Sequence, residues 1–123
     1  MGNTILVVDD AAVIRLMLRK ILSEGGYEVT GEAATGKEAV QKYNLLKPDL
    51  VIMDITMPEM NGLAALKEIK ATDPHARVVI CSAMGQKQLV QEAVEAGALS
   101  FMVKPFDPER VLEVVAKTLT VSI

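Results

Sequence analysis

The sequence predicts an α/β protein whose five parallel strands form one doubly wound sheet. Three observations predict this fold. Short apolar runs alternate with longer segments whose apolar residues recur every three or four positions, as strands and helices do. The connecting loops are short, and strand-helix alternation requires right-handed crossovers that place helices on both faces of a parallel sheet. The run Leu50–Met53 is apolar at every position, which is typical of a central strand buried on both faces.

Length and composition indicate one domain, which we expect to span residues 1–123. The net charge of −3 comes from interspersed charges without a basic stripe, which argues against nucleic acid as the main partner. The single cysteine, Cys81, excludes an internal disulfide and lies in an apolar run, so we expect a buried, unreactive thiol. No apolar run is as long as a membrane span and no signal-peptide pattern opens the chain, so we expect a cytoplasmic protein without membrane contact.

The first four predicted elements are two strands, each followed by a helix. Ile5–Val8 is an apolar strand, and the less continuous run Tyr27–Glu32 is expected nearer the edge of the sheet. The first helix ends at the glycines 25 and 26, and the second spans Gly36–Leu46 and ends before a proline. Helical spacing predicts that these residues face inward: Ile14, Met17, Leu18, Ile21 and Leu22 in the first helix, and Ala39, Val40 and Tyr43 in the second.

The remaining elements repeat this pattern three times. In order, the prediction is a strand at Leu50–Met53, a helix from Asn61 to before Pro74, a strand at Arg77–Cys81, a helix at Gln86–Ala96, a strand at Leu99–Val103 and a helix after Asp107. Asp107 followed by Pro108 suits the cap and first position of a helix. The residues expected to face inward are Leu63, Leu66 and Ile69, then Leu89, Val90, Ala93 and Val94, then Val111, Leu112 and Val115.

Polar side chains stand where four of the five strands end: Asp9 and Asp10, then Asp54, Ser82 and Lys104. The carboxyl ends of parallel strands share one edge, and open α/β sheets bind ligands there. Each residue alone has an ordinary explanation, since Asp10 could cap the following helix and Lys104 could be a solvated surface lysine. Their joint placement predicts a functional site at this edge of the sheet.

The chemistry of these groups favours magnesium and a phosphoryl group. Carboxylates this close repel one another, so a cation is expected among them, and hard oxygen ligands with room for water suit Mg²⁺. A divalent cation, an ammonium group and a hydroxyl are what phosphoryl transfer requires, because its catalysis is mostly positioning and charge stabilisation. The carboxylate of Asp54 would be the nucleophile and would form an aspartyl phosphate.

Four stretches of the sequence resemble the response regulator receiver family: Val7–Asp10, Met53–Gly62, Ser82–Ala83 and Val103–Phe106. The resemblance covers essentially the whole chain and is greatest to the chemotaxis, CheY-like members. It implies a (βα)5 flavodoxin-like fold with strand order 2-1-3-4-5, and a monomeric, free-standing two-component response regulator. Such a protein accepts phosphate from a CheA-like sensor histidine kinase and then binds an output partner such as a FliM-like flagellar motor switch protein.

The resemblance also implies roles for individual residues. Asp54 would be the phosphoacceptor, Lys104 and Ser82 would bind phosphoryl oxygens, and the Lys104-Pro105 bond would be cis. The implied Mg²⁺ ligands are Asp10, Asp54, the backbone carbonyl of Thr56, and Asp9 through water. Thr56 and Met84 stand at positions that tune the phosphate lifetime in the family. The protein would not be an enzyme, although it would contribute to its own phosphotransfer and autodephosphorylation.

Ser82 and Phe101 are the switch residues that the resemblance implies. Ser82 would move toward the phosphoryl group and Phe101 would turn inward, which remodels the face formed by the fourth helix and the fifth strand and helix. Three positions depart from common family forms, since Phe101 replaces Tyr, Ser82 replaces Thr and Asn61 replaces Asp. Phe101 lacks a phenol hydroxyl, and core filling is its ordinary explanation. Asn61 could alter the cap of the third helix.

Three rival interpretations are weighed against this one. The stretch Gly31–Glu38 resembles a P-loop, but Glu38 stands where a P-loop requires Ser or Thr, which argues against nucleotide binding. The chain could instead be the receiver of a longer DNA-binding regulator. It could also be a phosphorelay intermediate, which receives phosphate and passes it to another histidine.

Two apolar groups outside the predicted core are candidate contact surfaces. Ala12, Val13 and Leu16 lie on the outer side of the first helix and would serve as a docking patch in either a motor or a relay role. The loop methionines Met57, Met60 and Met84 could form an adaptable contact surface.

Overall fold

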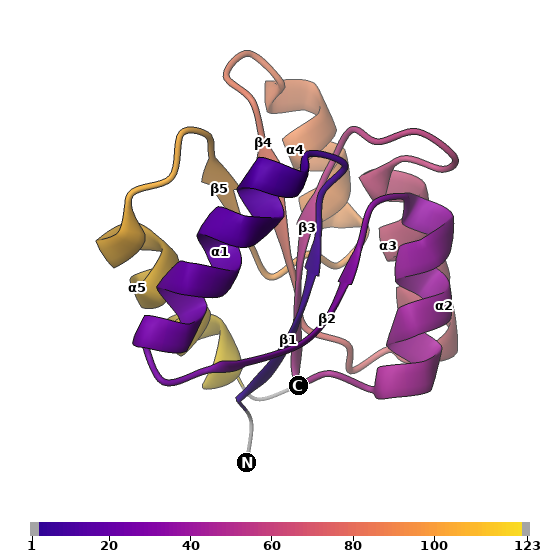
Figure 1. The fold of residues 1–123 in the computed structure, drawn as a ribbon. Coiled ribbons are helices and arrows are strands. Elements are labelled where there is room, and N and C mark those ends of the chain that lie inside the picture. The colour runs from indigo at the N-terminus through magenta and orange to yellow at the C-terminus, as the bar shows by residue number, and fades with distance from the viewer. Residues whose placement is uncertain (1–2, 122–123) are drawn as a thin grey trace.

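Five parallel strands form one sheet in the order β2-β1-β3-β4-β5 in the computed structural model, which describes residues 3–121 (Figure 1). The elements are β1 (Thr4–Val8), α1 (Ala12–Glu24), β2 (Glu28–Ala33), α2 (Gly36–Leu46), β3 (Leu50–Asp54), α3 (Gly62–Thr72), β4 (Val78–Ser82), α4 (Lys87–Glu95), β5 (Ser100–Val103) and α5 (Pro108–Leu119). The predicted fold class and strand order are confirmed. The second strand lies at an edge of the sheet, as its less continuous apolar pattern predicted.

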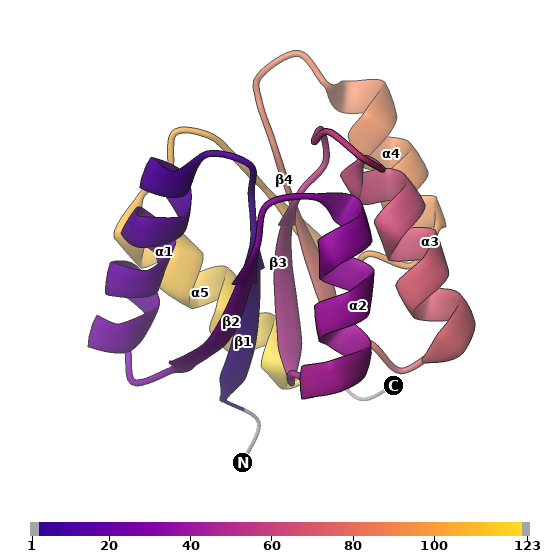
Figure 2. The same cartoon turned by 45° about the vertical axis from the view of Figure 1, so that its right-hand side comes forward.

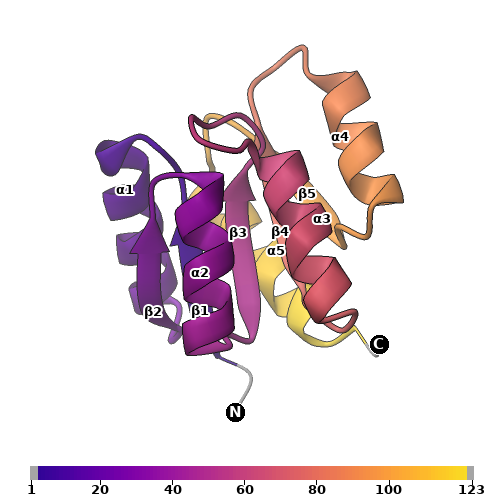
Figure 3. The same ribbon diagram turned by 90° about the vertical axis from the view of Figure 1, so that its right-hand side faces the viewer.

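The helices cover both faces of the sheet in two groups. Helices α1 and α5 lie on one face, and α2, α3 and α4 lie on the other (Figures 2 and 3). Alternate residues of each strand point to opposite faces. As a result, Ile5 and Val7 pack with α1 and α5, whereas Leu6 and Val8 pack with α2 and α3. Every residue of β3 and β4 is buried, as expected for central strands.

The helix boundaries follow local signals in the sequence. Asp107 accepts a hydrogen bond from the Glu109 amide, and Pro108 begins α5. The Asn61 side chain accepts a hydrogen bond from the Ala64 amide at 2.9 Å, so Asn at this position caps α3 fully. Thr35 caps α2 in the same way, through the Glu38 amide.

Two residues predicted to face the core lie instead at the surface. The side chain of Met17 is 40% exposed, and that of Val94 is 48% exposed. The buried stripe of α1 consists of Leu18, Ile21 and Leu22, which places Met17 beside the exposed apolar residues of the same helix. Helix α4 has Ala93 as its one buried residue, because it packs on α3 and the end of β4 while a cavity separates it from β5.

The structure also separates the three loop methionines. Met57 is buried and Met60 packs against the core beneath α2 and α3, whereas Met84 is exposed. The proposed contact surface therefore retains Met84 alone. Across residues 3–121, none of the helices is both long and apolar enough to span a lipid bilayer.

Candidate functional site

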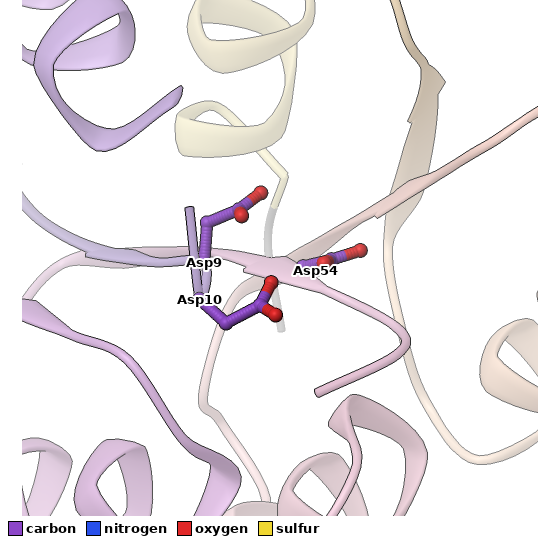
Figure 4. Close-up of side chains that lie close together, drawn as sticks. All are labelled: Asp9, Asp10 and Asp54. Atoms are coloured by element: carbon purple, nitrogen blue, oxygen red, sulfur yellow. The ribbon is translucent and has the colours of Figure 1, made fainter. Parts of the chain in front are cut away.

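Three carboxylates meet at the carboxyl edge of the sheet. Asp9 and Asp10 follow β1 and Asp54 ends β3, and these two strands are hydrogen-bonded neighbours in which Val8 pairs with Met53. One carboxylate oxygen of each residue lies within 4.8 Å of those of the other two (Figure 4). Asp9 and Asp54 are buried, whereas Asp10 is exposed. The predicted convergence of these acids is confirmed.

Lys104 joins this cluster from the far end of the sheet. Its Nζ lies 2.8 Å from Asp9 Oδ2 and 3.5 Å from Asp54 Oδ2. The Lys104 amide donates to the carbonyl of Ser82 at 2.8 Å, which extends the pairing of β5 with β4 by one residue. The Lys104-Pro105 peptide bond is cis, as the family resemblance implied.

The surroundings perturb the acidity of Asp54 and Lys104. Burial and the neighbouring charge of Asp9 raise the pKa of Asp54, although Lys104 and the Thr56 amide partly oppose this shift. Burial acts to lower the pKa of Lys104, but the carboxylates of Asp9 and Asp54 outweigh it, so the pKa of Lys104 is raised overall. Lys104 therefore remains an ammonium ion at neutral pH.

Asp9 and Asp10 have different local functions at the start of α1. Asp9 Oδ1 accepts a hydrogen bond from the Ala11 amide at 2.9 Å, and Ala11, not Asp10, is the cap residue of the helix. Within residues 3–121, the Asp10 side chain forms no hydrogen bond or ion pair. The alternative that Asp10 caps the helix is therefore wrong, and its carboxylate is available to a ligand.

The donor set fits a magnesium ion. The three carboxylates face one ammonium group, so two negative charges remain uncompensated. Asp9 Oδ2 is buried beside Lys104 without a hydrogen bond of good geometry. Hard oxygen ligands, of which one is exposed, suit a divalent cation that keeps several of its waters.

Ser82 and Phe101 lie on the wall of a second feature, a cavity of about 550 Å³ between β5 and α4. Ser82 ends β4 next to Cys81, the residue that pairs with Asp54, and it is buried. Phe101 lines the same cavity but is 43% exposed, so the core-filling interpretation of this side chain is wrong. The other apolar side chains of the wall are those of Ala83, Met84, Val90, Val94 and Val103.

Cys81 itself is buried, as predicted, and burial raises the pKa of its thiol.

The loop after β3 holds the site against α2. The amides of Gly36 and Lys37, which begin α2, donate to the carbonyls of Met60 and Glu59. Glu59 and Met60 have positive φ angles of 49° and 83°, which are strained for residues with a side chain. A P-loop would need those helix amides for phosphate, so their use here supports the rejection of nucleotide binding.

Two residues at the site had no recognisable signal in the sequence. Arg15 donates to the backbone carbonyl of Asp9 at 2.7 Å and pairs with Glu32 at 3.0 Å, which fixes the turn that carries the acids. Gln86 donates from Nε2 to Thr56 Oγ1 at 2.9 Å and accepts at Oε1 from the Ala83 amide at 2.7 Å. Neither contact could be read from residue spacing, because the first depends on how α1 packs beside β2 and the second on how two loops fold over the strand ends.

Comparisons with known proteins agree with this geometry. The response regulator receiver domain matches residues 5–116. The chemotaxis protein CheY of Thermotoga maritima is 59% identical over 117 residues, which is 95% of this chain and 98% of that protein. CheY of Bacillus subtilis is 56% identical over 119 residues, which is 97% of this chain and 99% of that protein.

Among solved structures, CheY in the CheX-CheY-BeF3-Mg²⁺ complex of Borrelia burgdorferi is 38% identical with a TM-score of 0.90, and the match covers 97% of this chain and 90% of that one. Fold, strand-end residues and sequence similarity lead to one conclusion: this chain belongs to the response regulator receiver domain family.

Proposed function

We propose that this chain is a free-standing response regulator of chemotaxis, in which Asp54 accepts a phosphoryl group from a phosphohistidine of a CheA-like sensor kinase. The observation that carries the proposal is the pairing of a buried carboxylate at the end of the central strand with an ammonium group 3.5 Å away. The similarity to CheY proteins along nearly their whole length supports the chemotaxis assignment.

Asp54 supplies the nucleophile. An oxygen of its carboxylate attacks the phosphorus atom, the phosphorus-nitrogen bond of the donor breaks, and the imidazole nitrogen takes the electron pair. The product is an acyl phosphate on Asp54. Because burial and Asp9 destabilise the Asp54 charge, the carboxylate is a stronger base than a solvated aspartate, which favours the attack.

Lys104 and Ser82 bind the oxygens of the transferred group. Lys104 lies between Asp9 and Asp54, so its charge is held where a phosphoryl oxygen on Asp54 would arrive. Ser82 provides a hydroxyl from the adjacent strand. Once the acyl phosphate has formed, the same groups take part in its hydrolysis, which is the contribution to autodephosphorylation. Beyond this, the protein is a signalling acceptor and not an enzyme.

Asp10, Asp54 and the backbone carbonyl of Thr56 would hold Mg²⁺, with Asp9 contributing through water. The ion would neutralise charge on the phosphoryl oxygens. The uncompensated charge of the acidic cluster and the lack of a partner for Asp10 support this assignment among residues 3–121.

Asp10→Asn is expected to weaken Mg²⁺ binding at least about tenfold, because substitution even of residues that only hydrogen-bond to a metal ligand lowers metal affinity by that factor. The protein has no tryptophan, so binding is measured by calorimetry or by amide chemical shifts. Asp107→Asn is the matched control, since Asp107 caps α5 and Asn caps a helix equally well. Equal affinity in parent and Asp10→Asn would contradict the ligand assignment.

Ser82 and Phe101 form the switch. Both line one apolar cavity, and Phe101 can enter it when Ser82 moves toward the phosphoryl group. Helix α4 is the element that such a move repositions, because Ala93 is its one buried residue. The face of α4, β5 and α5 would then bind an output partner such as a FliM-like motor switch protein.

The exposed residues Ala12, Val13 and Leu16 of α1 form the proposed docking patch for a partner protein in a motor role. The same patch would serve a phosphorelay partner, and capture assays with a FliM-like protein and with a histidine phosphotransfer protein separate these two roles. We also propose that the protein is a cytoplasmic monomer, with neither nucleic acid nor membrane as a partner.

The test is a titration with beryllofluoride, a mimic of the phosphoryl group that occurs with Mg²⁺ in the Borrelia CheX-CheY complex. We expect saturable, Mg²⁺-dependent changes in amide chemical shifts around Asp54 and, at a distance, around Phe101. Absence of these changes, or their full retention in Asp54→Asn, would overturn the proposed function. Changes at Asp54 without changes at Phe101 would overturn the proposed switch.

A further inference from the structure

The β4–α4 loop is closed over the edge of the sheet by one side chain. Gln86, the residue directly before α4, forms two hydrogen bonds with its carboxamide: Oε1 accepts from the Ala83 amide at 2.7 Å, and Nε2 donates to Thr56 Oγ1 at 2.9 Å. Thr56 lies two residues after Asp54, so the side chain joins the loops that follow β4 and β3. In Figure 1 the β4–α4 connection rises beside the ends of β3 and β4.

The Ala83 amide that Gln86 occupies faces the strand of Asp54. Ile55 donates to the carbonyl of Cys81 at 2.9 Å, so this edge of β4 pairs with β3. In a parallel ladder the next donor along the same edge is the amide of Ala83, and its partner would be the carbonyl of Ile55. That carbonyl accepts from Gly62 instead, at 2.9 Å. The sheet therefore ends with an amide that points toward β3 and is taken by Gln86.

We propose that the Gln86 carboxamide holds, in the unphosphorylated protein, the backbone donor of Ala83 that a phosphoryl group on Asp54 takes over. Gln86 thereby opposes phosphorylation of Asp54, and it is a positioning residue for the β4–α4 loop. The inference rests on the proposed function of Asp54. The exchange is favourable, because an amide bonds a charged phosphoryl oxygen more strongly than a neutral carboxamide.

Loss of the hydrogen bond between Gln86 and Ala83 would also affect helix α4. The Gln86 backbone lies at the start of that helix, but its side chain makes no cap bond to it. Release of the side chain therefore frees the loop from Ala83 to Gln86 and the first turn of α4 together. Gly85 within this loop has a positive φ of 88° and open space around it, so the loop can rearrange without a steric clash.

The test compares Gln86→Ala with the parent and with Gln88→Ala. Gln88 is an exposed residue of the same type two positions later, and its side chain forms no hydrogen bond within residues 3–121. With Mg²⁺ present, we expect Gln86→Ala to bind beryllofluoride about five-fold more tightly, as removal of two competing hydrogen bonds predicts. Gln88→Ala should match the parent. General damage to the site would lower the affinity, so a rise identifies release of a competitor.

A second measurement needs neither Mg²⁺ nor beryllofluoride. Hydrogen exchange of the Ala83 amide should be faster in Gln86→Ala than in the parent and in Gln88→Ala. Unchanged exchange, or a beryllofluoride affinity equal to or below that of the parent, would overturn the inference while the proposed function stands. Failure of the parent itself to bind beryllofluoride would overturn the proposed function and this inference with it.

Discussion

Asp54→Asn is expected to abolish phosphate incorporation from acetyl phosphate while the protein remains folded. The variant replaces the nucleophilic carboxylate with an amide of the same shape, so no acyl phosphate can form. Its thermal stability should equal or exceed that of the parent. The reason is that burial and the Asp9 charge raise the pKa of Asp54, so its ionised form destabilises the folded state at neutral pH. A neutral amide removes that effect.

The measurement is incorporation of labelled phosphate, with mass spectrometry to place the label and calorimetry to follow unfolding. Asp107→Asn serves again as the control, since it removes a carboxylate that caps α5 and does not belong to the acidic cluster, so it should label like the parent. Undiminished labelling of Asp54→Asn at a residue other than Asp10 would show that the acceptor has been misassigned. A clearly lower melting temperature would contradict the electrostatic argument.

Gly62→Ala is expected to destabilise the protein by about 3 kcal/mol, which lowers the melting temperature by roughly 12 °C for a domain of this size. A Cβ atom at this position would lie 2.1 Å from the Asp54 carbonyl oxygen and 2.7 Å from the Ile55 Cα. Both neighbours are backbone atoms of the strand end that carries the acceptor. Neither can move aside without moving Asp54, so acetyl phosphate reactivity should fall as well.

Gly31→Ala is the matched control for this substitution. Its Cβ would lie 2.6 Å from Leu46 Cδ1, the end of a flexible side chain that can rotate away. We expect a change below about 1 kcal/mol, as for Gly-to-Ala exchanges without backbone conflict. Thermal unfolding of both variants decides the matter, and equal melting temperatures would show that the contact at Gly62 relaxes easily.

The fold was predictable because its signals are local. The fully apolar runs identified β1, β3 and β4, and helical spacing with Gly, Pro and Asn signals placed the helices within a residue or two. Helical spacing wrongly predicted that Met17 and Val94 face the core, since each is an apolar residue at the margin of a helix face. Whether such a residue is covered depends on neighbouring elements, and periodicity within one helix carries no information about them.

The residues that form the site could be predicted from the sequence, but the hydrogen bonds that hold them could not. Topology alone brings Asp9, Asp54 and Lys104 to one edge, since all follow strands of a parallel sheet. The sequence could not tell that Asp9, and not Asp10, accepts a hydrogen bond from the Ala11 amide at the cap of α1, because both acids suit that role. The side-chain bridge of Gln86 was out of reach for the same reason, since it depends on loop conformation.

The first amides of α2 donate to the carbonyls of Glu59 and Met60 in the loop after β3. The loop after β3 should therefore tolerate sequence change less well than the loop after β4. On the β3 side, an insertion or a bulky substitution would leave the amide of the buried Gly36 without its partner, so variants there should be selected against during divergence. On the β4 side, Ala83 and Met84 are exposed, so their side chains can change without leaving a buried donor unpaired. Relatives that need different signal durations would therefore diversify mainly along the second loop.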